Sequence, residues 1–436
     1  MQTSVLTNWK IHFVVILISV IAELIGIQQI KTGIGVILFL PLLYAFILAL
    51  FFNENIIPSI GQHLGEHSSA TASQWVLIGI MPFIAKFGVG IGPNMDKLIA
   101  AGPALLLQEI GNVATALFAL PVAVLIFKMG REAIGATHSI AREPNIALVA
   151  DKFGLKSSEG VGVMGVYVMG TLFGTIFFSI MAALLASWDI FDYRALAMAC
   201  GVGSGSMMGA CSAALSETLP TLKDEIVAFA ASSNLLTYAT GLFVSAFIAL
   251  PFTEFFYRIL KKLRGSESSA ANQELADLTS SNGSEYTEEK EVSFSSIQTI
   301  MALVMVSVVA LIVNWVSTGV SFIDGLPGMA IFWLCSVLGY VIYQYVKIGV
   351  PAVAWISIVA IIFSIPQFPF SQEVIAYTSK IGLLPMITPV LAYAGLAISK
   401  MEIRLFKAAG FKIAIVALLT FVGTFVGSAI IAQALL

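Results

Sequence analysis

Charged residues are scarce in this sequence. Asp, Glu, Lys and Arg make up only 11% of its 436 residues, whereas soluble globular chains carry about 25%. Apolar residues reach 58%, and the mean hydropathy is +0.95. Because so apolar a chain cannot cover a water-exposed surface with polar groups, the composition excludes a water-soluble fold and a disordered tail.

Cysteine and net charge are also low. The three cysteines, Cys200, Cys211 and Cys335, lie in apolar or Gly-rich stretches, and their spacing fits no metal site. So few cysteines exclude a small disulfide-rich secreted domain. The chain has 22 basic and 25 acidic residues, a net charge of -3. This balance gives no electrostatic reason to expect nucleic acid as a partner.

Several sequence motifs of enzymes are absent. There is no Gly-x-x-x-x-Gly-Lys-Ser/Thr phosphate loop, no His-Glu-x-x-His zinc helix and no Gly-x-Ser-x-Gly elbow. No apolar run carries the regularly spaced arginines of a voltage sensor. The sequence therefore predicts a protein that is not an enzyme and that has no cofactor or metal centre, with a transported sodium ion left open.

What the sequence has in abundance is long apolar runs. A helix needs roughly 17–25 apolar residues to cross a bilayer, and runs of about this length recur to the C-terminus. We therefore expect an all-α integral membrane protein of about eleven transmembrane helices. The expected spans are Ile11–Ile27, Gly35–Phe52, Trp75–Ile91, Leu98–Phe127, Gly160–Ser187, Ile226–Phe256, Ile297–Trp315, Gly328–Val346, Val350–Ile365, Ile381–Ile398 and Ala408–Leu435.

One polar segment divides these runs. Arg264–Glu291 is rich in Ser, Asn, Glu and Gly, the composition of a solvated flexible linker. The sequence therefore predicts an N-terminal membrane half at 1–263, a linker at 264–292 and a C-terminal membrane half at 293–436.

Basic residues in short loops predict the orientation. They cluster after the fourth span, after the sixth span and between the last two spans. All three clusters can be cytoplasmic if the Gly/Ser-rich segment at about 198–219 enters the membrane and returns to the same side. We then expect a multi-pass protein of the cell's inner (plasma) membrane, with the N-terminus and the linker cytoplasmic and the C-terminus external.

Two segments resemble each other weakly. Met81-Pro82 followed by Gly88–Gly102 is matched by Thr388-Pro389 followed by Gly395–Gly410. In the expected topology these segments run in opposite directions. Inverted repeats are usual in secondary transporters, although Gly/Ala-rich apolar stretches also match by chance.

The largest cluster of polar residues within an apolar run consists of Gln108, Glu109, Asn112 and Thr115. Helical spacing places Gln108, Asn112 and Thr115 on one stripe with Glu109 beside it. Polar side chains in hydrocarbon are costly and commonly functional. A carboxylate between amides can coordinate a cation or accept a proton, so Gln108, Glu109 and Asn112 are candidate ion-coupling residues; a helix-packing network is the alternative.

A second candidate site lies in the Gly/Ser-rich segment. Ser204, Gly205 and Ser206 fall among several glycines, which allow the backbone to turn and to approach a ligand closely. Free amides there can bind an anion such as a carboxylate, whereas close helix packing is the structural alternative. Asn234, with Ser233 and Thr237, is expected to complete this substrate site.

The stretch from Gly130 to Asn145 is unusually polar for this chain. It is either a second re-entrant element that lines a cavity or an ordinary cytoplasmic loop. In the first case Thr137, His138, Ser139 and Arg142 would face the substrate, and Arg142 would pair with a carboxylate or phosphate.

Three segments carry a resemblance to known families. They are Gly130-Arg-Glu-Ala-Ile-Gly-Ala-Thr137, Gly165-Val-Tyr-Val-Met-Gly-Thr-Leu-Phe-Gly174 and Gly201-Val-Gly-Ser-Gly-Ser-Met-Met208. With these, nearly the whole chain resembles a prokaryotic family of permease-like membrane proteins of unknown function. In architecture alone it is similar to sodium/glutamate symporters and related elevator-type carboxylate carriers. Their Gly-Gly-His-Gly element has no equivalent beyond Ala136-Thr-His-Ser139, so no residue role is carried over.

The sequence therefore predicts a secondary active transporter of a small organic anion, such as a carboxylate or an amino acid, coupled to sodium or protons. An elevator-type movement is what the second resemblance implies. An ion or small-solute channel and a membrane-embedded enzyme are the alternatives. The expected partners are a small anionic molecule and the lipid bilayer, with a homodimer left open.

Overall fold

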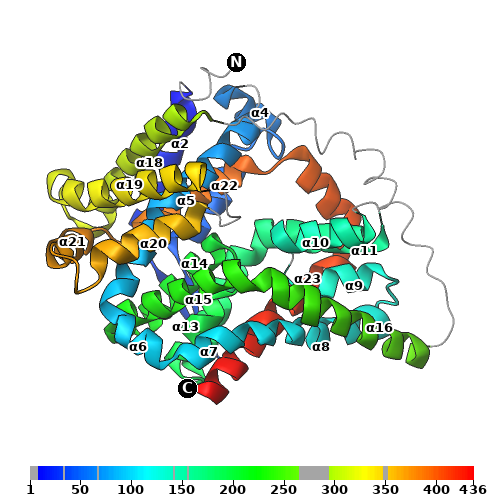
Figure 1. Ribbon diagram of the computed structural model, residues 1–436. Coiled ribbons are helices and arrows are strands. Elements are labelled where there is room, and N and C mark those ends of the chain that lie inside the picture. Colours follow the sequence, from blue (N-terminus) through cyan, green and yellow to red (C-terminus); the bar gives the residue numbers. More distant parts are fainter. Residues whose placement is uncertain are drawn as a thin grey trace. The chain divides into compact units, whose positions relative to one another are not determined.

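Helices make up most of the protein (Figure 1). The computed structural model describes residues 8–32, 35–65, 68–140, 143–154, 157–264, 294–346 and 352–436. Within these ranges the strands form a single two-stranded sheet. The expected all-α class is thus confirmed.

The chain divides into two compact units, each assembled from segments on both sides of the predicted linker. The first unit is Met1–Ala100, Gly209–Ala231 and Glu291–Ser399, and the second is Ala101–Met208, Ser232–Lys290 and Lys400–Leu436. The division falls within α14 (Gly205–Thr218) and α15 (Lys223–Val244), so each of these helices contributes to both units.

The first unit is built on packed apolar helices with one hairpin. Its further elements are α2 (Trp9–Ile25), β1 (Gln28–Thr32), β2 (Gly35–Phe39), α3 (Pro41–Phe51), α4 (Pro58–Gly61), η1 (Gln62–Leu64), α5 (Ser68–Ile91), η2 (Gly92–Asn94), α6 (Met95–Ala100), η6 (Pro220–Leu222), α18 (Ser296–Thr318), α19 (Phe322–Tyr345), α20 (Ala352–Ser364), α21 (Ser371–Thr378) and α22 (Leu383–Ala397).

The second unit contains more interrupted helices than the first. Its further elements are α7 (Gly102–Leu107), η3 (Gln108–Asn112), α8 (Val113–Pro121), η4 (Val122–Ile126), α9 (Glu132–Thr137), α10 (Glu143–Phe153), α11 (Ser158–Met169), η5 (Gly170–Gly174), α12 (Thr175–Ser187), α13 (Tyr193–Gly201), η7 (Ser245–Ala249), α16 (Leu250–Arg264) and α23 (Lys400–Leu435). Three of these, η4, η5 and η7, are single π-helical turns, which often mark functional sites.

Among the described residues, six continuous helical segments are long and apolar enough to cross a membrane. They are Ser68–Ala100, Gly102–Ile126, Ser158–Ser187, Ser296–Thr318, Phe322–Tyr345 and Gly410–Leu435. The pair α21 and α22, bent by 62°, would make a seventh. The protein is therefore membrane-embedded, but the count of eleven spans and the inverted repeat are not confirmed.

Two of the expected spans are not confirmed because their apolar runs fold into shorter elements. The runs expected to be the second and ninth spans form the short helices α3, of 11 residues, and α20, of 13 residues. The start of the expected second span, up to Leu40, is not helical, because β2 pairs with β1 in antiparallel register, Ile30 opposite Ile37. Hydropathy alone cannot distinguish a buried strand or a short buried helix from part of a span.

Several helices begin at side-chain caps that the sequence supplies. Ser157, Asp192, Ser295 and Ser321 each accept a hydrogen bond from a backbone amide in the first turn of the helix that follows. Ser295 and Gln298 form a complete capping box at α18. This helix ends at Gly319, whose φ of 74° favours glycine.

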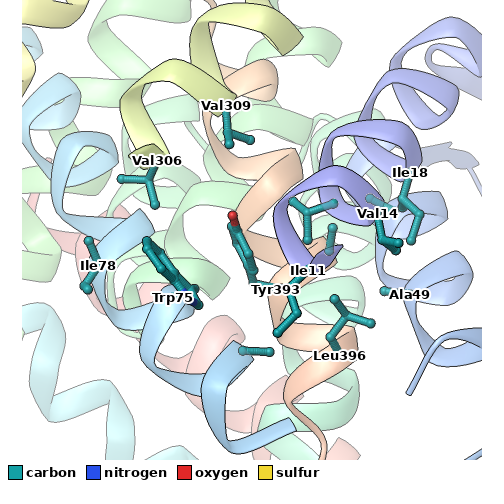
Figure 2. Packing of buried hydrophobic residues seen from close by; sticks show 14 of the residues in the cluster. Ile11, Val14, Ile18, Ala49, Trp75, Ile78, Val306, Val309, Tyr393 and Leu396 are labelled. Carbon is teal, nitrogen blue, oxygen red and sulfur yellow. The ribbon is translucent and has the colours of Figure 1, made fainter. Parts of the chain in front are cut away.

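The core of the first unit surrounds a pair of large aromatic side chains. Figure 2 shows Trp75 of α5 beside Tyr393 of α22, among apolar residues of α2, α3 and α18. The two rings stack with centroids 6.2 Å apart. The Tyr393 hydroxyl lies 2.6 Å from Nδ1 of His12, so the phenol keeps a hydrogen-bond partner although it is fully buried.

In the second unit, α23 packs against α8, α11 and α13 (Figure 1). Glycines allow the closest approach. A Cβ added to Gly111 of η3 would lie 2.4 Å from the backbone nitrogen of Ser428, and one added to Gly427 would lie 2.4 Å from the carbonyl oxygen of Gly111. Backbone contact between η3 and α23 thus fixes the position of the segment that carries Glu109.

Candidate functional site

The candidate site lies where a membrane-spanning helical segment changes its winding. Gly102–Ile126 begins as the α-helix α7, tightens into the 3-10 helix η3 over Gln108–Asn112 and continues as α8. A 3-10 stretch inside a longer helix often marks a functional hinge or strain. Three of the predicted polar residues, Gln108, Glu109 and Asn112, all fall in η3.

Glu109 is buried, with 1% of its surface exposed, and it accepts several hydrogen bonds. Asn112 donates its Nδ2 to Oε2 at 2.9 Å, and Gln108 approaches Oε1 with its Nε2 at 3.4 Å. The hydroxyl of Thr237, on α15, also donates to Oε1. The structure therefore brings the three predicted ion-coupling residues together and adds Thr237 to them.

Gln108 connects this carboxylate to α15 and α13. Its Nε2 donates to the hydroxyl of Ser233 at 2.8 Å, and that hydroxyl donates to the carbonyl of Met198 at 2.7 Å. The Oε1 of Gln108 is buried and has no hydrogen-bond partner among the described residues. A buried amide oxygen without a donor is destabilising, and it is a suitable ligand for a hard cation.

Asn234 holds the Gly/Ser-rich segment in place. Its Nδ2 donates to the carbonyls of Gly201 at 2.7 Å and Gly203 at 2.8 Å, where α13 ends. Both hydrogens of this amide are therefore used to fix the backbone before Ser204. The contacts give Asn234 a positioning role, and its direct contact with substrate remains a prediction.

Of the predicted substrate residues, Ser204 ends the turn between α13 and α14, and Gly205 and Ser206 are the first two residues of α14. The Ser204 hydroxyl lies 3.3 Å from the backbone nitrogen of Met207 and 3.1 Å from the hydroxyl of Ser206, so it caps the first turn of α14. Ser204 and Ser206 are partly exposed, whereas Gly205 is buried. The expected turn is thus present, and the use of its amides for substrate remains a prediction.

A π-helical turn packs against this segment. The added Cβ of Gly174 in η5 would lie 2.1 Å from Cε of Met207, so the side chain of Met207 occupies the space that the glycine leaves. Thr175, which follows η5, lies 3.5 Å from Ser206 through its hydroxyl. Gly170 and Gly174 therefore allow close packing, and their partner is Met207 in the Gly/Ser-rich segment.

The polar stretch after the fourth expected span is not an exposed loop where it is described. Every residue from Glu132 to Ser139 is buried. The carbonyl of Ala136 accepts from the hydroxyl of Thr420 at 3.1 Å, and the carbonyl of Thr137 accepts from Thr115 at 2.6 Å. Helix α9 thus ends beside α8 and α23 with its last carbonyls paired, while its re-entry from one side of a membrane remains a prediction.

His138 follows α9 and lies outside the spanning helices. Its Nδ1 is 3.0 Å from the carbonyl of Gly135, and its Nε2 is 3.3 Å from the hydroxyl of Ser139. Burial lowers the pKa of His138 to about 4. The imidazole is therefore neutral near pH 7. Arg142, the predicted substrate arginine, lies outside the described residues, whereas Arg131 pairs with the buried Glu159.

A row of buried hydroxyls that was not predicted lies along α23. Thr420, Thr424 and Ser428 recur at intervals of four along α23, and all three are fully buried. Thr420 bonds to α9, whereas the hydroxyls of Thr424 and Ser428 have no partner among the described residues. Their spacing in the last apolar run was the signal that could have revealed them.

Glu23 and Lys86 are single charged residues within apolar runs. Both lie in the first unit, where each forms hydrogen bonds. Glu23 of α2 accepts from the hydroxyls of Thr388 at 2.6 Å and Ser317 at 2.7 Å. Lys86 of α5 donates to the carbonyl of Ile381 at 2.5 Å, at the bend between α21 and α22. The bend thus has its freed carbonyl paired by a charged side chain.

Chemically, the second unit offers a carboxylate, two amides and a hydroxyl around η3. These are oxygen-rich groups that suit a proton or a hard monovalent cation. No group of three or more His, Cys, Asp or Glu side chains gathers for a transition metal in the part of the chain that the structure describes.

One comparison with known proteins identifies the family. A family model described as "Protein of unknown function (DUF3100)" matches residues 20–259, more than half of the chain. The chain belongs to this family. The match covers η3, α9, η5 and the Gly/Ser-rich segment, whereas α23 lies beyond it.

No curated protein and no solved structure matches the DUF3100 chain. A likeness to sodium/glutamate symporters is therefore not shown.

Proposed function

We propose that this protein is a secondary active transporter of a small organic anion, such as a carboxylate or an amino acid, coupled to sodium or protons. It would work in the plasma membrane, with Gln108, Glu109 and Asn112 as the cation site. Ser204–Ser206, where α14 begins, would bind the substrate, with Asn234 positioning this segment.

The observation that carries this proposal is the buried carboxylate of Glu109 in the 3-10 interruption of a spanning segment. A buried carboxylate is costly unless it is paired with hydrogen-bond donors or cations. Gln108, Asn112 and Thr237 supply such donors and hold the carboxylate ionised and in a fixed position, so we infer that a cation or proton binds there, which is what ion coupling requires. The burial of Gln108 and Glu109 supports a carrier that occludes its coupling ion over a channel with an open pore.

The connection between the two candidate sites supports coupling. Gln108 bonds to Ser233, and the next residue on α15, Asn234, holds the carbonyls before Ser204. A change at Glu109 would thus be transmitted to the substrate turn through α15. The two ligands would stabilise each other's binding by equal free energies, as linkage requires.

A thermal-shift screen tests the proposal. The purified full-length protein would be heated with organic acids and amino acids, with sodium chloride or choline chloride, at several pH values. A ligand at a hundredfold excess over its Kd stabilises the fold by about 2.7 kcal/mol. We expect an anion whose stabilising effect depends on sodium or on acidic pH. Silence across a broad anion panel, in a folded sample, would contradict the organic-anion assignment.

A further inference from the structure

Helix α16 has three distinct faces along its length. Thr253, Tyr257 and Leu260 are buried against the second unit. Phe255, Ile259 and Leu263 form a second face, and they are exposed by 60%, 40% and 73%. The third face carries Arg258, Lys261 and Lys262, all exposed.

The end of α16 is fixed against its own unit. The guanidinium of Arg264 donates through Nη1 to the carbonyl of Met129 at 2.8 Å and approaches the carbonyl of Val124 at 3.3 Å. The inward face is therefore set by packing at Tyr257 and by hydrogen bonds at Arg264. The apolar and basic faces cannot exchange places by rotation of the helix.

The arrangement of polar and apolar residues on a helix distinguishes one that crosses the membrane from one that lies in its plane. A helix that crosses a bilayer changes polarity along its axis, because its depth changes with each residue. In the last two turns of α16 the polarity changes around the axis. Arg258 is adjacent to Ile259 and Lys262 is adjacent to Leu263, and successive residues point about 100° apart. This arrangement is typical of a helix that lies in the membrane interface, with aromatic and aliphatic side chains inward and basic ones at the headgroups.

We propose that α16 lies in the plane of the membrane interface and binds anionic phospholipid. Phe255, Ile259 and Leu263 contact the acyl chains, and Arg258, Lys261 and Lys262 contact the phosphate groups. Charge complementarity selects this occupant. Glu254, the acidic residue on the basic face, pairs with Lys152 at 2.9 Å and lies 3.8 Å from Arg258, so the face keeps an excess of positive charge. The exposed basic side chains thus attract an anionic surface.

Cysteine labelling in nanodiscs tests the orientation. Four single variants of the full chain, Arg258→Cys, Ile259→Cys, Lys262→Cys and Leu263→Cys, would be exposed to a membrane-impermeant maleimide. The native Cys200, Cys211 and Cys335 are fully buried, and the unsubstituted protein gives their background. We expect the two cysteines on the apolar face to react at least about tenfold more slowly than their neighbours. Equal reaction within both pairs would overturn the proposal.

A second measurement tests the lipid class. The unfolding temperature would be compared in nanodiscs of phosphatidylcholine with and without phosphatidylglycerol. We expect phosphatidylglycerol to raise it, and the triple variant Arg258→Gln/Lys261→Gln/Lys262→Gln to lose that rise. The control Lys10→Gln/Lys223→Gln/Lys380→Gln removes three exposed charges elsewhere and should keep it. An unchanged rise in the α16 variant, or an equal loss in the control, would show that α16 has no special affinity for anionic lipid.

Discussion

At the scale of single residues, Glu109 draws its hydrogen bonds from two distant parts of the chain. Gln108 and Asn112 are its neighbours in sequence, whereas Thr237 is 128 positions away. A buried acceptor that loses its donor pays the desolvation cost of that group. The hydroxyl of Thr237 should therefore matter more to the site than its methyl group.

Replacing Thr237 with Val tests this contact. Thr237→Val keeps the side-chain shape but removes the donor, so we expect a loss of about 1–3 kcal/mol in the free energy of unfolding. Thr237→Ser keeps the hydroxyl and serves as the matched control, with a smaller loss. Denaturant unfolding in detergent measures both variants. A Val variant as stable as the Ser variant would mean that the hydroxyl does not stabilise Glu109.

The buried imidazole of His138 should make the free energy of unfolding depend on pH. Its pKa is lowered by burial from 6.5 to about 4, so between these values the unfolded chain binds a proton that the folded chain does not. Stability should be full above pH 6.5 and fall as the pH falls toward 4, by up to about 3 kcal/mol. The thermal unfolding of wild type and His138→Gln between pH 7.5 and 4 checks this. Parallel curves for the two proteins would refute the assignment.

Residue-level prediction from the sequence succeeded where neighbours in sequence are also neighbours in space. Gln108, Glu109 and Asn112 were expected together, and their hydrogen bonds join them. The predicted stripe of Gln108, Asn112 and Thr115 assumes α-helical spacing, whereas η3 is a 3-10 helix. The unpartnered hydroxyls of Thr424 and Ser428 were missed, because a hydroxyl in an apolar run can bond its own backbone and gives a weak signal.

At the scale of elements, close backbone contact between η3 and α23 positions the site. Gly111 and Gly427 allow this contact, since an added Cβ at either position would meet backbone atoms. Such contact transmits any displacement directly, because a backbone cannot change rotamer to relieve a clash. The geometry of Glu109 therefore depends on two residues that carry no chemistry.

Gly111→Ala should separate η3 from α23 and lower the stability by about 1–3 kcal/mol. Gly102→Ala is the matched control in the same spanning segment, because its added Cβ would have no neighbour within 4 Å. Removing glycine there should leave stability unchanged or raise it by about 0.4–1 kcal/mol. Thermal unfolding of the two variants compares them directly. Equal changes in unfolding temperature for the two variants would show that the backbone contact at Gly111 accommodates a Cβ without loss of stability.

The sequence predicted helical class and membrane embedding well, because both follow from composition. It predicted individual spans less well. Gly35–Phe39 is as apolar as a span but pairs as a strand with Gln28–Thr32. Whether an apolar run crosses, turns or ends within the fold depends on tertiary packing, which hydropathy does not contain.

At the scale of the whole molecule, the order of segments in the chain does not follow the compact units. Both units contain residues from before and after the polar segment 265–293. The predicted halves at 1–263 and 293–436 are divisions of the sequence, and packing groups its segments differently. Folding of each unit thus requires contacts between segments that are far apart in the chain.

The predicted orientation has a direct test in the polar segment. The basic residues Arg258, Lys261, Lys262 and Arg264 predict that this segment is cytoplasmic. A protease site inserted between Ser280 and Ser281 should be cut in inside-out vesicles and protected in intact spheroplasts. Cleavage in spheroplasts alone would reverse the predicted orientation.

The central claim is that Glu109 couples solute movement to an ion gradient. Its most direct test is uptake into proteoliposomes of the ligand found by the thermal-shift screen, driven by an imposed sodium or pH gradient. We expect Glu109→Gln to fold, because an amide fills the same space, but to lose the dependence of uptake on the ion. Normal uptake by Glu109→Gln with unchanged ion dependence would contradict the account.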